Sequence, residues 1–259
     1  MDLDLLLPEV ISWARGAGAI QMSYFRTGQL DPRAKLNDAD IVTAADAACE
    51  SFITARISDA FPDHSILSEE SGEHRGCDSE WRWVVDPLDG TTNFNAGLPL
   101  FCVSIALQHH GETVLGVVYA PRLDELFTAI RGDGARLNGE PVSAAREDCL
   151  GRMVVATGFP VDKGVNSDNN LDNVARVMPH VRGLRRLGSA ALDMCYVAAG
   201  FLDAYWELNL HLWDVAAAEL IVTEGGGVAR RFRPDSQERN VCMLAASSKA
   251  ISVIEPFLK

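Results

Sequence analysis

The sequence predicts a layered fold of helices and strands, of the α/β or α+β class. Three features support this prediction. Apolar residues recur at helical spacing near the N-terminus, short apolar runs separated by turn residues follow, and helices then alternate with strands. The chain has 259 residues, 47% of them hydrophobic, which suits one large domain or two closely joined subdomains. We place the subdomain boundary between 1–145 and 146–259.

Two helices are expected first. Apolar residues at helical spacing predict a helix from Pro8 to about Phe25, with Gly28 placed to end it. A second helix should start near Thr43, because Thr43 and Asp46 have the spacing of a capping box.

Strands dominate the next part of the chain. The apolar runs expected to form them are 66–67, 83–85, 102–107, 113–119 and 125–130. His109 and His110 lie beside Gly111, so this pair is expected on an exposed hairpin, and the remaining histidines lack zinc-ligand spacing.

Helices and strands alternate in the second half. Strands are expected at 153–156, 204–206 and 242–246, and helices at 171–181, 189–199, 213–223 and 251–258.

Charge and hydropathy exclude several functions. The formal net charge is −13, which argues against broad nucleic-acid binding because a polyphosphate would be repelled. A small anionic substrate remains possible if a bound metal reverses the local charge. The N-terminus lacks the pattern of a signal peptide, and no apolar run approaches the ~20 residues that span a bilayer. We therefore expect a cytoplasmic protein that does not enter membranes.

The most specific pattern lies at 83–94. An apolar run leads directly into Asp86 and Pro87, and Asp89 follows at a turn; Pro87 is expected to stop strand pairing. Two carboxylates three residues apart at a strand end, with the Leu88 carbonyl, are hard oxygen ligands of the kind that Mg²⁺ prefers. A solvated turn is the alternative interpretation of this short pattern.

The next residues predict a phosphate contact. Thr91 and Thr92 can open a helix, so the amides of Gly90 and Thr91 would point at a phosphate group.

The string Asp86 to Phe94 resembles the D-P-[LI]-D-G-T-T-N-F signature of the inositol monophosphatase family, which is magnesium-dependent and lithium-sensitive. Other blocks match in the family's order and spacing: 40–46, 68–71, 188–191, 203–207, 213–217 and 224–227. The resemblance implies an α+β fold, the layered αβαβα sandwich shared with fructose-1,6-bisphosphatase, and a homodimer.

The resemblance also implies a carboxylate cluster that holds two or three Mg²⁺ ions. Glu69, Asp86 and the carbonyl of Leu88 would hold the first ion. Asp86, Asp89 and Asp214 would hold the second, and a third would depend on Glu69.

Catalysis would then use a metal-activated water and no covalent phosphoenzyme. Thr91 and Asp46, with Glu69 nearby, would orient or deprotonate this water. Other roles stay open: Asp46 and Thr91 as helix caps, and Asp214 as a helix N-terminal charge.

A larger set is expected to contact the substrate. Ser189, Ala190 and Glu207 match family positions that face the alcohol, and Arg185 or Arg186 would add positive charge at the mouth. A structural Glu207 and a solvated arginine pair are the alternatives. The segment from 159 to 173 is expected to shape the pocket. The full set is Glu69, Leu88, Asp89, Gly90, Thr91, Arg185, Ser189, Ala190, Glu207 and Asp214.

Three functional hypotheses follow. The first is hydrolysis of inositol 1-phosphate to myo-inositol and phosphate. The second keeps the chemistry and changes the substrate to fructose 1,6-bisphosphate, histidinol phosphate or a nucleotide phosphate. The third is a regulatory binding protein on the same fold, and retention of the metal-ligand residues speaks against it.

Overall fold

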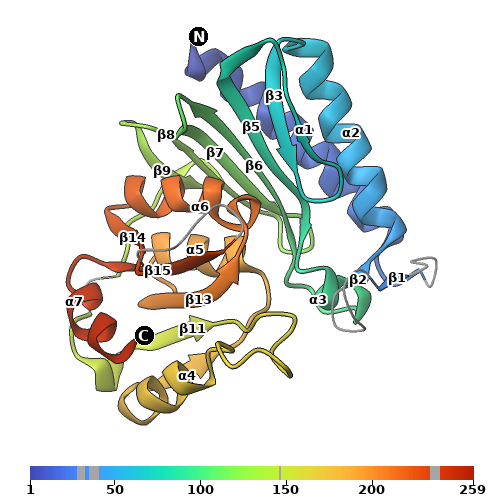
Figure 1. The fold of residues 1–259 in the computed structure, drawn as a ribbon. Helices are drawn as coiled ribbons and strands as arrows, with labels where there is room; N and C mark the ends of the chain where they lie inside the picture. Colours follow the sequence, from blue (N-terminus) through green and yellow to red (C-terminus); the bar gives the residue numbers. More distant parts are fainter. Residues whose placement is uncertain (28–32, 35–40, 146, 234–239) are drawn as a thin grey trace.

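A computed structural model describes residues 1–27, 33–34, 41–145, 147–233 and 240–259 (Figure 1). Two β-sheets alternate with three layers of helices, which confirms the predicted α+β sandwich. The predicted boundary near 145 falls between the two sheets, beside residue 146, which lies outside the described residues. The division into two closely joined subdomains stays a prediction.

The outermost layer is formed by α1 (Leu3–Tyr24) and α2 (Ala44–Ala60). Helix α1 begins five residues before the predicted start, because the Asp2 carboxylate accepts from the Asp4 amide (3.1 Å) and caps it. Pro8 lies inside this helix. Gly28, the predicted stop, lies outside the described residues.

The capping box at the start of α2 is confirmed. The Thr43 amide donates to Asp46 Oδ2 (2.8 Å), and the Thr43 hydroxyl in turn accepts from the amide of Ala45 (3.2 Å).

The first sheet has the strand order β10-β9-β8-β7-β6-β5-β3-β4. Only β3 and β5 pair in parallel among the described strands of this sheet. Its strands are β3 (His64–Ser68), β4 (Gly72–His74), β5 (Asp78–Asp89), β6 (Cys102–His109), β7 (Glu112–Ala120), β8 (Glu125–Ile130), β9 (Gly134–Leu137) and β10 (Glu140–Pro141). A short pair, β1 (Arg33–Ala34) and β2 (Ile41–Val42), lies apart from it.

The prediction that Pro87 ends strand pairing was wrong. Strand β5 continues to Asp89, which pairs with Cys102 on β6 after a register shift that begins at Asp86. The shift leaves Pro87, which has no amide proton to donate, out of the ladder without ending the strand.

The second sheet has the order β12-β11-β13-β15-β14. Its strands are β11 (Val154–Thr157), β12 (Gly183–Arg185), β13 (Ala204–Leu210), β14 (Gly227–Arg231) and β15 (Val241–Ser247). Strands β4, β9, β10, β12 and β14 are short or edge elements that the apolar pattern did not predict.

Helices α5 (Ala190–Ala198) and α6 (Leu212–Glu224) fill the layer between the sheets, and α4 (Leu171–Val177) and α7 (Ala250–Ile254) cover the outer face of the second sheet (Figure 1). Both outer helices are shorter than predicted and continue as 3₁₀ turns, Met178–His180 and Glu255–Phe257. Pro179 and Pro256 within these turns cannot donate a helical hydrogen bond.

Three apolar cores join the layers. Trp13, Ile53 and Trp83 pack in the core between α1, α2 and the first sheet. The largest core lies between the two sheets, and a smaller one lies on the outer face of the second sheet. Within the part of the chain that the structure describes, no helix combines the length and apolar character needed to cross a membrane.

Candidate active site

The centre of the site is the end of strand β5. Asp86 is 1% exposed, and its Oδ1 accepts from the Leu88 amide (2.9 Å). In a regular strand, residues three apart point to opposite faces. The register shift between Asp86 and Asp89 removes this alternation and brings both carboxylates to one face.

Four carboxyl groups converge here, and their charges act on one another. Burial raises the pKa of Asp86 well above its usual range, and the charges of Glu69, Asp89 and Asp214 raise it further. Burial, then the charge of Asp214, raises the pKa of Asp89 to about 6. A cation bound among these groups would offset their mutual repulsion.

Asp89 is held by the second half of the chain. Its Oδ2 accepts from the Ser189 hydroxyl (2.6 Å) and from the Ala191 amide (2.8 Å) at the start of α5. The thiol of Cys102 lies 3.8 Å from the same oxygen. Ser189 and Ala190 are buried at this helix start, so the structure brings both predicted substrate residues to the cluster.

Glu69 follows the end of β3 and is fixed from both sides. The Ser68 hydroxyl (2.5 Å) and the Glu70 amide (2.9 Å) both donate to Glu50 Oε2 on α2. Glu50 was missed by the sequence analysis. The feature that could have identified Glu50 is its position, an acidic residue four positions after Asp46 on the buried side of a helix.

Thr91 and Asp46 meet beside the Leu88 carbonyl. The Thr91 hydroxyl lies 3.0 Å from Asp46 Oδ1 and 3.0 Å from the Leu88 carbonyl, so its one proton is shared between two acceptors. Asp46 also caps α2 through its other oxygen. The capping interpretation and the catalytic interpretation are therefore compatible in geometry.

Asp214 lies in the first turn of α6 and accepts from the His211 amide (2.6 Å). Its charge also raises the pKa of both Asp86 and Asp89. It is thus a helix-terminal charge and a member of the cluster at once.

Gly90 links the strand to α3 (Thr91–Asn95) with a left-handed backbone, φ +94°. A Cβ there would lie 2.9 Å from the Leu100 carbonyl oxygen, so only glycine fits. This tight turn places Asp89 and Thr91 on either side of Gly90 within one site.

Glu207 on β13 faces the cluster from the second sheet. Its Oε2 accepts from the Tyr205 hydroxyl (2.6 Å), and burial raises its pKa to about 7 against the opposing effect of Tyr205 and Arg186. Its carboxylate packs against Gly158, which immediately precedes the segment predicted to shape the pocket.

The structure distinguishes the two arginines. Arg185 is exposed on the edge strand β12 and donates to the adjacent Leu184 carbonyl (3.2 Å). Arg186 is the one whose charge acts on Glu207. Of the predicted pair, Arg186 rather than Arg185 lies toward the carboxylates, because Arg185 belongs to an edge strand of the sheet.

Asp193 on α5 was not predicted. It is 1% exposed, and its Oδ1 has no hydrogen-bond partner among the described residues. Burial, then the charges of Glu207 and Asp89, raise its pKa well above the usual range, and Arg186 opposes this effect. A buried carboxyl oxygen with this free acceptor capacity, beside the cluster, suits a site that binds a further polar group.

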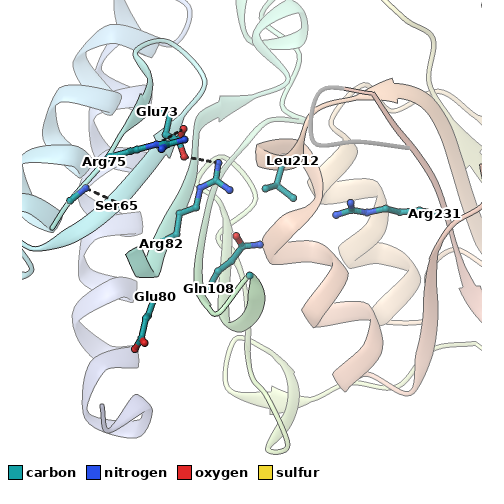
Figure 2. Close-up of a pocket in the computed structure, with 10 residues that line it drawn as sticks. Ser65, Glu73, Arg75, Glu80, Arg82, Gln108, Leu212 and Arg231 are labelled. Atoms are coloured by element: carbon teal, nitrogen blue, oxygen red, sulfur yellow. Dashed lines mark hydrogen bonds and ion pairs between the residues drawn. The ribbon is translucent and has the colours of Figure 1, made fainter. Parts of the chain in front are cut away.

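A separate pocket of about 410 Å³ lies toward the first residues of β3 and β5 (Figure 2). Arg75 and Arg82 lie near Glu73 on one side of it, and Arg231 lies across from them. It contains none of the predicted site residues.

Comparison with known proteins decides the family. The profile described as "Inositol monophosphatase family" matches residues 2–252. The chain belongs to the inositol monophosphatase family. It is therefore an enzyme of the phosphomonoesterase class to which that family belongs.

Its relatives in this family have two different names. An inositol-1-monophosphatase of Mesorhizobium japonicum is 48% identical over 188 residues, 73% of this chain and 71% of that protein. The Nus factor SuhB of Salmonella typhimurium is 41% identical over 227 residues, 88% of this chain and 85% of that protein. The crystal structure of the suhB protein of Bartonella henselae has a TM-score of 0.90 and 38% identity, covering 98% of both chains.

Proposed function

We propose that this family member hydrolyses a small phosphate monoester with Mg²⁺, and that inositol 1-phosphate is its leading substrate. The buried Asp86, faced by three further carboxyl groups, carries the proposal. A relative 48% identical that is named inositol-1-monophosphatase supports the choice of substrate.

The donor set fits Mg²⁺, which prefers hard oxygen ligands. We assign Glu69, Asp86 and the Leu88 carbonyl to one ion and Asp86, Asp89 and Asp214 to a second, with a third beside Glu69. When bound, the ions would neutralise the phosphate and supply a nucleophilic hydroxide near neutral pH.

The chain's own residues would position the reacting groups. The Thr91 hydroxyl can donate to Asp46 or to the Leu88 carbonyl, which leaves its oxygen to accept from a water and orient that water toward phosphorus. Water would form the new bond to phosphorus, the phosphorus–alkoxide bond would break, and the alkoxide would take up a proton. No covalent phosphoenzyme is needed, and Glu69 would assist proton removal.

The alcohol side of the substrate would lie toward α5 and β13. Ser189 and Ala190 start α5, and Glu207 can accept hydrogen bonds from polyol hydroxyls. Arg186, in place of the predicted Arg185, would add positive charge there. Fructose 1,6-bisphosphate, histidinol phosphate and nucleotide phosphates remain the alternative substrates.

Phosphate release from a panel of esters tests this proposal. The panel holds inositol 1-phosphate, fructose 1,6-bisphosphate, histidinol phosphate, adenosine 3′,5′-bisphosphate and NADP, each with and without Mg²⁺. We expect Mg²⁺-dependent release that is fastest with inositol 1-phosphate. Another leading substrate would contradict the substrate assignment, and release without Mg²⁺ would contradict the metal assignment.

A second candidate function is a role in transcription complexes, favoured by 41% identity to proteins named Nus factor SuhB. It corresponds to the regulatory binding protein considered above. A retention experiment tests this role. The affinity-tagged chain is passed over immobilised RNA polymerase, and the retained amounts of the native protein and of Asp89→Asn are compared. Equal retention of both would show binding that is independent of catalysis, and no retention would contradict this role. Location in the cytoplasm and assembly as a homodimer both stay predictions. Analytical ultracentrifugation would measure the oligomeric state.

A further inference from the structure

The turn between β6 and β7 carries two adjacent histidines that the proposed reaction does not use. His110 and Gly111 form a two-residue hairpin loop, and both have a left-handed backbone, φ +51° and +80°. This is the type I′ pattern that matches the twist of the flanking strands. Neighbouring side chains in a strand point to opposite faces, but this turn brings the rings of His109 and His110 to 4.2 Å between centroids.

A third polar side chain reaches the same point from β5. The amide of His110 donates to the Glu80 carbonyl (2.8 Å), which fixes the turn against the strand. His110 Nε2 then lies 3.9 Å from Glu80 Oε2. One ligand atom from each of Glu80, His109 and His110 lies within 4.8 Å of the other two.

The rings are held in place by stacking. His109 is paired with Trp81 across the two strands, and their ring centroids are 4.0 Å apart at an interplanar angle of 22°. The Glu80 side chain points away from the arginines of the neighbouring pocket (Figure 2). Glu80 and His110 are 59% and 61% exposed, so an ion can enter from solvent.

We propose that Glu80, His109 and His110 form a second metal site, which binds one divalent transition-metal ion such as Zn²⁺. Two imidazoles and one carboxylate are typical Zn²⁺ ligands, whereas Mg²⁺ prefers oxygen alone. Ligands 2.0–2.1 Å from a tetrahedral Zn²⁺ lie about 3.3 Å apart, so the three groups need to move by only about 1 Å. Solvent water would complete the coordination.

This site is separate from the carboxylate cluster. Glu80 and Asp86 are six residues apart on one strand, which corresponds to about 20 Å at ~3.3 Å per residue. Zn²⁺ bound here would tie the β6–β7 turn to β5 without contacting the proposed catalytic residues. Sequence spacing could not show this site, because its carboxylate comes from another strand.

Calorimetric titration with Zn²⁺ tests the proposal. The whole chain is used, and saturating Mg²⁺ is present to occupy the carboxylate cluster. We expect His110→Ala to bind one Zn²⁺ fewer per chain, and Glu80→Gln to bind this ion at least ~10-fold more weakly. His74→Ala, which removes an exposed histidine on β4, should bind as the native chain does. The same Zn²⁺ stoichiometry and affinity in the native chain and in both site variants would overturn the site.

Tryptophan fluorescence gives a second measurement that does not depend on stoichiometry. Ni²⁺ held by His109 should quench Trp81, which is stacked on it. Quenching should be lost in Trp81→Phe and in His110→Ala, while Mg²⁺-dependent phosphatase activity stays within twofold of the native value in His110→Ala. Unchanged quenching in both variants would place the ion elsewhere.

Discussion

Asp89 is the residue at which charge repulsion and hydrogen bonding oppose each other most directly. Two donors from the second half of the chain stabilise its anion, while burial and the charge of Asp214 destabilise it. A carboxylate kept in such a position is more useful for binding a cation than for stabilising the fold.

Asp89→Asn should abolish activity and preserve the fold. The amide oxygen can still accept from Ser189 and Ala191, but one negative charge of the cluster is lost. We expect kcat/KM to fall by at least ~10²-fold in phosphate-release assays. Asp59→Asn, which neutralises an exposed carboxylate on α2, is the control and should behave as the native chain. Unchanged turnover in Asp89→Asn would overturn the metal assignment.

The metal-free protein should lose stability as pH rises. The pKa of Asp89 is about 6 when folded, against an ordinary 3.8. A carboxyl group with a raised folded pKa holds its proton more strongly in the folded state, so stability decreases as pH passes from about 4 through about 6. Asp86 is shifted in the same direction.

Thermal melts of EDTA-treated protein at pH 4.5 and pH 7 measure this effect. We expect a melting temperature lower at pH 7 by on the order of 5 °C, with a smaller difference in Asp89→Asn and in saturating Mg²⁺. A metal-free protein more stable at pH 7 would contradict the predicted direction.

At the scale of elements, α2 and the turn after β5 hold the carboxylate cluster in place. Glu50 on α2 accepts two donors that flank Glu69. Gly90 sets the angle between β5 and α3. Substitution of Glu50 or of Gly90 should therefore disturb the carboxylate cluster indirectly.

Glu50→Ala should weaken metal binding more than it lowers the maximal rate. Without the acceptor, Ser68 and Glu70 lose their common anchor and Glu69 is no longer held. We expect the Mg²⁺ concentration for half-maximal activity to rise about 10-fold. Glu50→Gln should recover most of this loss, because one oxygen accepts both donors. Equal Mg²⁺ requirements in Glu50→Ala and the native chain would show that Glu50 does not position Glu69.

Gly90→Ala should damage stability and activity together. Both Gly90 and Gly139 have a left-handed backbone, φ +94° and +86°, but no atom lies within 4 Å of a Cβ added at Gly139. Gly139→Ala should therefore cost only the conformational term, about 1–2 kcal/mol. Gly90→Ala adds the clash with the Leu100 carbonyl and displaces Asp89, so we expect a larger loss of stability in urea melts and about 10²-fold lower kcat. Equal losses in the two variants would contradict the argument from close packing.

At the scale of the whole molecule, the site joins the two sheets. Glu69, Asp86 and Asp89 come from the first sheet, whereas Asp214 and Glu207 come from α6 and β13. Because the proposed ligands come from both halves, a bound cation would link the two halves, and metal binding should stabilise the whole fold.

Mg²⁺ should raise the melting temperature of the metal-free protein. A ligand at 100 times its dissociation constant stabilises by about 2.7 kcal/mol, which corresponds to roughly 5–10 °C for a chain of this size. Differential scanning calorimetry with and without Mg²⁺ measures the shift, with K⁺ at equal ionic strength as the control. A melting temperature that does not respond to Mg²⁺ would count against the assignment.

The sequence by itself determined the fold class, the family and the principal carboxylates. Helical spacing predicted α2, and the Thr43–Asp46 capping box that starts it is confirmed, because such a cap depends on residues only three apart. Asp86 and Asp89 were recognised because a long motif is local in the chain. Metal-ligand and catalytic roles for the predicted site residues stay predictions.

The tertiary structure alone decided which distant residues meet. Glu50 supports Glu69 across 19 positions, Asp193 lies buried beside Glu207, and Glu80 joins the histidine pair from a neighbouring strand. The sequence also did not predict the register shift at Pro87 or the short edge strands, because pairing in a sheet depends on the partner strand rather than on local pattern. Local patterns in a sequence fix helices, caps and motifs, whereas contacts between segments depend on how the layers pack.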